Sequence, residues 1–352
     1  MKKKLLVIVV SILFCIAAVP SRADAEPSVS ARNAVLMDMD SGRVLASKSA
    51  HERRAIASIT KIMTALLAIE SGRMNEKVKF SERALQVEGS SLYLEKGQSL
   101  TLEELVYGLM LRSGNDAALV ISEFVGGSTP KFVAMMNKKA QQIGMKNTVF
   151  MNPHGLDDPS HQSTAYDMAL LTAKAMENPE YRKIAGTALY KTKSSPVRVW
   201  ENKHRLVRTG GMVTGGKTGY TKKTGRTLVT TAKKNGLQLV AVTLDAPDDW
   251  RDHQALFEDG FTEYKPITVV EKERFTVPGE HNFFYAKKTV RFPLTDKEKK
   301  SSYVRIVLEQ KKKGGRAELW IGETKQLEVP IYRSENPNQD ASIWTKMKEA
   351  IR

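Results

Sequence analysis

Three short segments of the chain combine side chains that could perform nucleophilic catalysis. In the first, Ser58-Ile59-Thr60-Lys61, helical geometry would place the serine and the lysine within about 60° of each other on one face. A helix dipole favours negative charge at a serine in the first turn, and burial lowers the pKa of a lysine enough for it to act as a base. The spacing therefore predicts a serine nucleophile activated by lysine, without a histidine.

The second segment is Ser113-Gly114-Asn115, which follows one expected helix and begins another. A hydroxyl and a carboxamide on such a junction could relay a proton and hold a substrate amide. The alternative is a turn whose polar residues only cap the helices.

The third segment is Gly216-Lys217-Thr218-Gly219. Its glycines would let the backbone approach a ligand closely. Lys217 adds positive charge, and Thr218 offers a hydroxyl donor suited to a carboxylate. The alternative is a glycine-rich turn before a hairpin.

Each pattern has a second copy, and the order of the copies selects one set. Only Ser58, Ser113 and Lys217 give the three patterns in sequence, at successive offsets of 55 and 104 residues. The other copies, at 128–131, 334–336 and 223–225, are out of order, contain a proline or fall in an expected hairpin turn. These three residues therefore define the candidate site.

The elements around these segments predict how they are positioned. A helix that is apolar nearly all round is buried, and the helix carrying Ser58 is of this kind. Expected helices cover 59–69, 102–112, 116–125, 130–143, 165–176 and 248–264, and expected strands cover 34–38, 43–47, 226–233 and 237–245. The order predicts an α/β domain over 26–265, in which a helical subdomain is inserted into an antiparallel sheet.

After Pro266 the chain changes to short β-rich runs broken by glycine, proline and charged residues. These runs predict a small all-β domain over 266–340. Residues 265–352 contain 19 Lys and Arg against 12 Asp and Glu, a net charge of +7.

The N-terminus has the pattern of a signal peptide over 1–25. Three lysines precede an apolar run over 5–19, and Ala23-Asp24-Ala25 predicts cleavage before Glu26. The alternative is an uncleaved anchor, for which the run is short. Cleavage would remove the single cysteine and lower the net charge from +16 to +13. An exported basic protein is expected to meet anionic wall polymer or a membrane surface, and not nucleic acid.

The last residues, 341–352, are a candidate membrane-surface helix. Ile343, Trp344, Met347 and Ile351 are interspersed with basic residues, which is typical of an amphipathic helix on anionic lipid. The segment is short for an independent helix, so the alternative is a terminal helix docked on the protein.

With these motifs in place, the sequence resembles the low-molecular-mass penicillin-binding D-alanyl-D-alanine carboxypeptidases. The residues around the motifs agree over 56–64, 111–118, 152–157 and 163–169. The resemblance implies a β-lactamase and DD-peptidase-like fold, and it looks closest to the branch that acts on spore cortex in Gram-positive bacteria. Stem peptides ending in D-Ala-D-Ala are the implied substrates, and β-lactams the implied covalent inhibitors.

The resemblance also assigns roles. Ser58 would attack the carbonyl of the penultimate D-Ala, with Lys61 as base, and Ser113 would relay protons to the leaving amine. Asn115 would bind the substrate backbone. The backbone N–H groups of Ser58 and Tyr220 would form the oxyanion hole.

The terminal carboxylate of the substrate has its own implied partners. Lys217 would supply positive charge, while Thr218 and Thr214 would bind the carboxylate. No cofactor or metal is expected, because the six histidines lack clustered acidic partners. His154 is expected to shape the rim of the cleft.

Four alternative functions remain open at this point. A class A β-lactamase shares the three motifs, but it usually has Asp at the position of Gly114 and lacks a C-terminal β-domain. A D,D-endopeptidase or a transpeptidase would use the same residues on cross-linked peptides. A non-catalytic wall-binding scaffold would not need the complete set of side chains.

Overall fold

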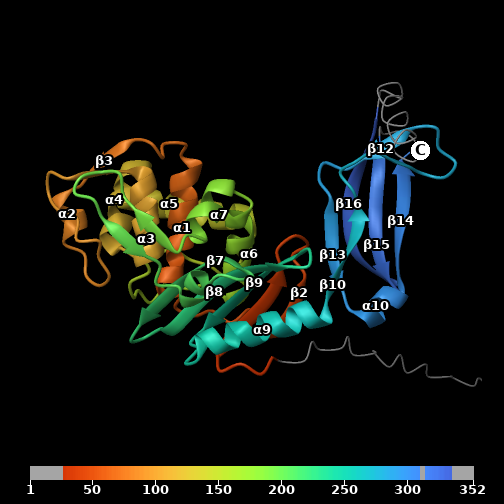
Figure 1. Cartoon of the computed structure of the whole chain (residues 1–352), viewed down its shortest axis with the longest axis horizontal. Coiled ribbons are helices and arrows are strands. Elements are labelled where there is room, and N and C mark those ends of the chain that lie inside the picture. The colour runs from red at the N-terminus through yellow and green to blue at the C-terminus, as the bar shows by residue number, and fades with distance from the viewer. Residues whose placement is uncertain (1–26, 310–313, 335–352) are drawn as a thin grey trace, which may run out of the picture.

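The computed structural model describes residues 27–309 and 314–334. The signal peptide and the terminal helix that the sequence predicts lie outside these residues. Figure 1 shows two parts, a larger one in which helices cover a sheet and a smaller one built mainly of strands. No helix within the described ranges is long and apolar enough to cross a membrane.

An antiparallel sheet of five strands forms the base of the larger part, in the order β2-β1-β9-β8-β7. Its strands are β1 (Asn33–Asp38), β2 (Val44–Lys48), β7 (Val213–Thr221), β8 (Gly225–Lys234) and β9 (Leu237–Leu244). The first strands of the chain therefore pair with strands that follow the helical insertion, as predicted. The edge strand β7 carries Lys217.

Helices lie on both faces of this sheet (Figure 1). On one face, α9 (Asp249–Glu263) buries Leu256, Phe257 and Phe261 against the strands. The other face supports the helical subdomain, which comprises η1 (Ala57–Thr60), α1 (Lys61–Glu70), α2 (Glu82–Leu85), α3 (Leu102–Arg112), α4 (Asn115–Gly126), α5 (Thr129–Ile143), α6 (Ala165–Met176) and α7 (Pro179–Ala185). A short helix, α8 (Arg205–Thr209), packs against the edge strand β7. Two small hairpins accompany it, β3 (Lys77–Lys79) with β4 (Ser99–Thr101) and β5 (Leu189–Lys191) with β6 (Val199–Glu201).

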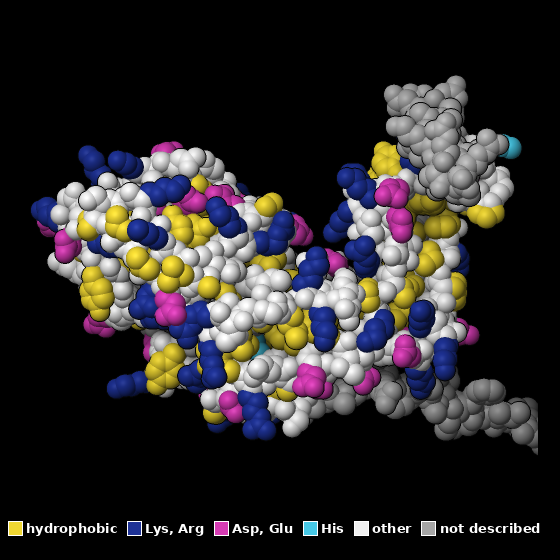
Figure 2. Space-filling model, in the orientation of Figure 1, with side chains coloured by type: hydrophobic (Ala, Val, Ile, Leu, Met, Phe, Trp, Pro, Cys, Tyr) yellow, Lys and Arg dark blue, Asp and Glu magenta, His cyan; other side chains and the backbone are white. Residues whose placement is uncertain are grey.

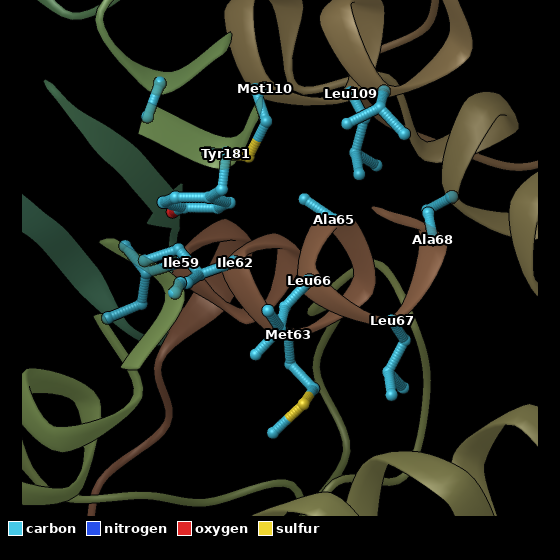
Figure 3. Packing of buried hydrophobic residues seen from close by; sticks show 14 of the residues in the cluster. Ile59, Ile62, Met63, Ala65, Leu66, Leu67, Ala68, Leu109, Met110 and Tyr181 are labelled. Carbon is cyan, nitrogen blue, oxygen red and sulfur yellow. The ribbon is translucent and has the colours of Figure 1, made fainter. Parts of the chain in front are cut away.

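Helix α1 runs through the centre of the subdomain, as its apolar sequence predicts. All its residues from Lys61 to Ile69 are buried. Figure 3 shows its side chains among those of Leu109 and Met110 on α3 and of Tyr181 on α7. Burying an aliphatic side chain contributes about 1.5–3 kcal/mol, so this packing fixes the position of the residues at the start of α1.

The smaller part has its own apolar core, which includes Phe284, Phe292 and Leu319. Two strands, β10 (Lys265–Val270) and β13 (Val290–Leu294), pair with each other. The second sheet has the order β11-β12-β16-β15-β14. Its strands are β11 (Phe275–Thr276), β12 (Phe283–Tyr285), β14 (Ser302–Glu309), β15 (Gly314–Ile321) and β16 (Thr324–Arg333), and a short helix, α10 (Asp296–Lys300), precedes β14. The sequence pattern missed β12 and α10.

One arginine joins the two parts. Arg43, at the start of β2, donates hydrogen bonds to the Pro293 carbonyl (2.6 Å) and to Glu298 (2.5 Å). Its guanidinium also lies over the rings of Tyr264 and Phe292. These contacts attach the β-rich part to the hairpin of β1 and β2. The exact domain limits at 265 and 340 stay a prediction.

Candidate active site

Ser58 lies in the 3-10 turn η1, directly before α1 begins at Lys61. The sequence predicts the first turn of an α-helix here, but in a 3-10 turn side chains three residues apart are eclipsed. Ser58 Oγ and Lys61 Nζ consequently lie 3.0 Å apart. Ala57, just before the serine, has a φ of 49°, a strained conformation of the kind that clusters at functional sites.

Lys61 is fully buried, and its amine contacts three oxygens. Nζ donates to Asn115 Oδ1 at 2.7 Å and to the His154 carbonyl at 2.6 Å. A neutral amine has two N–H groups and one lone pair. These two acceptors can therefore use both hydrogens and leave the lone pair facing Ser58 Oγ.

Electrostatics favour the neutral form of this lysine. Burial is the main cause that lowers the pKa of Lys61 well below its usual value, and the charges of Lys217 and Lys203 act in the same direction. Asp116 opposes them more weakly. A lysine with a lowered pKa can accept a proton at neutral pH.

Ser113 and Lys217 form a second pair beside the first. Ser113 ends α3 in the left-handed region, with φ at 66°, and its Oγ accepts a hydrogen bond from Lys217 Nζ at 2.9 Å. Lys217 also donates to the Thr218 carbonyl at 2.8 Å. Burial, and then the charge of Lys203, lower the pKa of Lys217 from 10.5 to about 7. The contact joins the helical subdomain to the edge strand of the sheet.

The segment 88–94 forms one wall of the site, and the sequence did not predict this wall. Asn115 donates from its backbone N–H to the Ser90 carbonyl (2.7 Å) and from Nδ2 to the Glu88 carbonyl (2.6 Å). The buried Asp116 accepts from the backbone N–H groups of Leu92 and residue 94 and from Ser91 Oγ. Two adjacent residues at the start of α4 therefore hold this segment beside the motif.

The edge strand β7 lies directly against η1. A Cβ added to Gly219 would be 2.9 Å from the Ser58 nitrogen and 2.4 Å from Thr227 Oγ1. Only a glycine leaves room for this approach. The backbone N–H of Ser58 therefore lies beside the strand that continues into Tyr220.

The predicted carboxylate-binding residues differ in their surroundings. Thr218 is half-buried next to Lys217. Thr214 lies in a β-bulge, and its hydroxyl is within 2.8 Å of Thr231 Oγ1. Tyr220 exposes 64% of its surface. Within the described residues, Thr214 has no hydrogen bond to the other candidate side chains, so its predicted role stays a prediction.

His154 contributes its backbone to the site. Its carbonyl accepts from Lys61, while its ring Nδ1 accepts from the Leu156 N–H at 3.1 Å. Burial lowers the pKa of His154 to about 3. A Cβ on the adjacent Gly155 would be 2.0 Å from the Ala57 carbonyl oxygen, so this loop packs closely against η1.

The second copies of the motifs at 128–131 and 223–225 lie elsewhere in the fold, and the copy at 334–336 lies mostly outside the described residues. Ser128 caps α5, and Thr224 bonds to Thr221 in the turn between β7 and β8. Lys203 lies closer to the site, with Nζ 3.0 Å from Ser90 Oγ, although no sequence pattern pointed to it. Among the described residues, no group of three or more His, Cys, Asp or Glu is arranged to hold a metal ion.

The sequence matches one family model and several curated proteins. The family model for D-alanyl-D-alanine carboxypeptidases matches residues 20–248. D-alanyl-D-alanine carboxypeptidase DacF of Bacillus subtilis is 41% identical over 223 residues, which are 61% of this chain and 57% of that protein. The chain thus spans less than two thirds of the length of this curated relative.

Solved structures agree with the fold. Penicillin-binding protein 5 of Haemophilus influenzae superposes with a TM-score of 0.76 and 26% identity, covering 88% of this chain and 98% of that one. A Streptomyces K15 DD-transpeptidase variant superposes with a TM-score of 0.64 and 27% identity, covering 67% of this chain and 100% of that one. With its motifs assembled in one buried site and the family model matching most of its length, the chain belongs to the D-alanyl-D-alanine carboxypeptidase family.

Proposed function

We propose that the protein is a serine D-alanyl-D-alanine carboxypeptidase that removes the terminal D-Ala from peptidoglycan stem peptides. The observation that carries this proposal is the pairing of two serines with two buried lysines, Ser58 with Lys61 and Ser113 with Lys217. Neither lysine has a carboxylate partner within the described residues. Such unpaired buried amines are typical of catalytic sites.

In the acylation step, Lys61 takes the proton of the Ser58 hydroxyl, and Oγ attacks the carbonyl carbon of the penultimate D-Ala. The developing oxyanion is stabilised by the backbone N–H groups of Ser58 and Tyr220. One such donor contributes a factor of about 10²–10³ to the rate. The close approach of Gly219 to the Ser58 nitrogen supports this placement.

The tetrahedral intermediate then loses the terminal D-Ala. Ser113 passes a proton to the leaving amine, and Lys217 supplies the positive charge beside it. Asn115 holds the substrate backbone, and Thr218 binds the terminal carboxylate, with Thr214 as a second hydroxyl. Water hydrolyses the acyl-enzyme and regenerates Ser58. A β-lactam resembles the D-Ala-D-Ala terminus and acylates Ser58 in the same way.

The proposed location is supported by the family and by the residue patterns of the segments 1–25 and 341–352. The family is one of extracytoplasmic proteins. We infer export through the segment 1–25 and peripheral attachment of 341–352 to the outer face of the cytoplasmic membrane. Basic side chains are interspersed with acidic ones over the face in Figure 2, which suits anionic wall polymer as surroundings. A role in spore cortex is part of the same proposal.

The function is tested with a fluorescent penicillin and a pentapeptide ending in D-Ala-D-Ala. The wild type should be labelled covalently and should release free D-Ala, and Ser58→Ala should do neither. Ser128→Ala is a matched control, because Ser128 belongs to the second copy of the motif and caps α5. Labelling that persists in Ser58→Ala would show that another residue is the nucleophile.

The same assays separate the alternatives. The structural likeness to a DD-transpeptidase favours transpeptidation as the second candidate, which predicts transfer of the acyl group to an added amine acceptor. Cleavage of cross-linked dimers alone would indicate an endopeptidase, and rapid β-lactam turnover would indicate a β-lactamase. Absence of labelling would leave the wall-binding scaffold.

A further inference from the structure

Two basic side chains, Arg198 and Lys203, contact segment 88–94, and a third, Arg112, directly precedes Ser113. We call these three side chains the rim cations. Lys203 Nζ donates to Ser90 Oγ at 3.0 Å. Arg198 Nη2 donates to Gln98 Oε1 at 2.7 Å. Arg112, directly before Ser113, donates from Nη1 to the carbonyl of residue 201 at 3.2 Å.

None of the rim cations forms an ion pair with any described residue. Two acidic side chains linked to them through the hydrogen-bond network are already engaged. The Glu201 side chain pairs with Arg208 at 2.9 Å, and Asp116 accepts from the backbone of segment 88–94. In addition, Arg198 Nη1 is buried without a hydrogen-bond partner.

Lys203 lies close to Arg112, because its backbone N–H donates to the Leu111 carbonyl at 2.9 Å. Burial and the charge of Arg112 lower the pKa of Lys203. The charge of Lys203 in turn lowers the pKa of both Lys61 and Lys217. A cluster of like charges without counter-charges repels itself and is costly unless a ligand compensates it. The missing counter-charge is therefore expected on the substrate.

The position of the cluster indicates which part of the substrate carries that charge. Segment 88–94 is held by Asn115 through two hydrogen bonds, and Asn115 is the residue proposed to bind the peptide backbone before the scissile bond. The terminal carboxylate is assigned instead to Thr218, on strand β7. The rim cations thus belong to the wall along which the upstream part of the peptide would lie.

We propose that the rim cations bind a second carboxylate of the peptide, located upstream of D-Ala-D-Ala, so that the enzyme selects acidic stem peptides over amidated ones. This inference rests on the proposed function and names its substrate class. Hydrogen-bonded contacts between a partly exposed cation and a carboxylate typically give about tenfold discrimination.

The test uses synthetic pentapeptides ending in D-Ala-D-Ala that differ only in one upstream group, a free carboxylate or its carboxamide. For the wild type, we expect kcat/KM to be about tenfold higher for the carboxylate peptide. The preference should shrink at high ionic strength, because exposed charges are screened. Lys203→Met should lower the ratio to about two, and Lys203→Arg should restore most of it.

One control variant and two contradicting outcomes make the test decisive. Lys233→Met removes one exposed charge at the far end of β8 and should keep the wild-type ratio. If Lys203→Met reduces turnover of both peptides and acylation by penicillin by one common factor, Lys203 serves the terminal carboxylate or the catalytic lysines, and the proposal is wrong. Equal kcat/KM for both peptides in the wild type also overturns it. Failure of the proposed function would appear differently, as absence of D-Ala release from either peptide.

Discussion

Two buried sites, one in each part of the molecule, treat charge in opposite ways. In the larger part, Lys61 and Lys217 are buried without a carboxylate partner, and burial lowers the pKa of both. In the smaller part, Glu318 is equally buried but accepts hydrogen bonds from Arg305, Arg316 and the Trp320 indole. These donors lower the pKa of Glu318 to about 2.

The difference separates the proposed catalytic site from a site that holds a fold. A paired buried charge keeps its usual ionisation and contributes to structure, and removing one partner destabilises the protein. An unpaired buried lysine is poised to exchange a proton, which is useful only in a reaction. Substitutions of Lys61 and Lys217 should therefore affect rate, and substitution of Glu318 should affect stability.

The largest expected effect is that of Lys61→Met. Without the base, the rate of acylation by penicillin should fall by a factor of about 10²–10⁴. The substitution leaves Asn115 Oδ1 and the His154 carbonyl without a donor, but it also removes a buried amine. These two effects on stability oppose each other.

Stopped-flow labelling and thermal unfolding of Lys61→Met give the two readouts. We expect a large loss of rate with a small change in the unfolding midpoint. A variant that keeps more than a tenth of the wild-type acylation rate would exclude Lys61 as the base. A collapse of the midpoint would mean that this lysine holds the fold as Glu318 does.

Next in size is the effect of Gly219→Ala. The added Cβ would lie 2.9 Å from the Ser58 nitrogen, so strand β7 must move away from η1. Loss of one oxyanion donor should reduce kcat by a factor of about 10²–10³. Turnover of the pentapeptide measures the loss, and unchanged kcat would place the oxyanion hole elsewhere.

Lys217→Arg should change the pH profile of acylation. The rate should rise with pH as Lys61 loses its proton and fall again above about 7, where the amine of Lys217 becomes neutral. An arginine stays protonated over this range, so the alkaline decline should disappear in the variant. A decline at the same pH in both proteins would assign it to another group.

The sequence predicted the sheet, the long helices and the three motifs that the structure brings together, because all of them depend on periodicity or local spacing. It did not predict the short hairpins of β3–β4 and β5–β6, whose strands are only three residues long. Nor did it predict segment 88–94 or the role of the His154 carbonyl. These features depend on tertiary contacts, such as those of Asp116 with the backbone of Leu92, which leave no periodic signal.

Glu318→Gln is expected to have the smallest effect on rate. It tests the stability side of the comparison between Glu318 and the two buried lysines. A carboxylate whose pKa is lowered in the folded state from 4.5 to about 2 stabilises the protein above pH 4.5, and this contribution is lost as the pH falls towards 2. The variant should therefore unfold at a lower temperature than the wild type at pH 7, and the difference should shrink between pH 4.5 and 2. Its turnover of the pentapeptide should equal that of the wild type, because Glu318 lies on strand β15, in a sheet that contributes no side chain to the candidate site. Equal melting curves at pH 7 would mean that the arginine pairs contribute no stability, and the contrast between the two parts would then rest on the lysines alone.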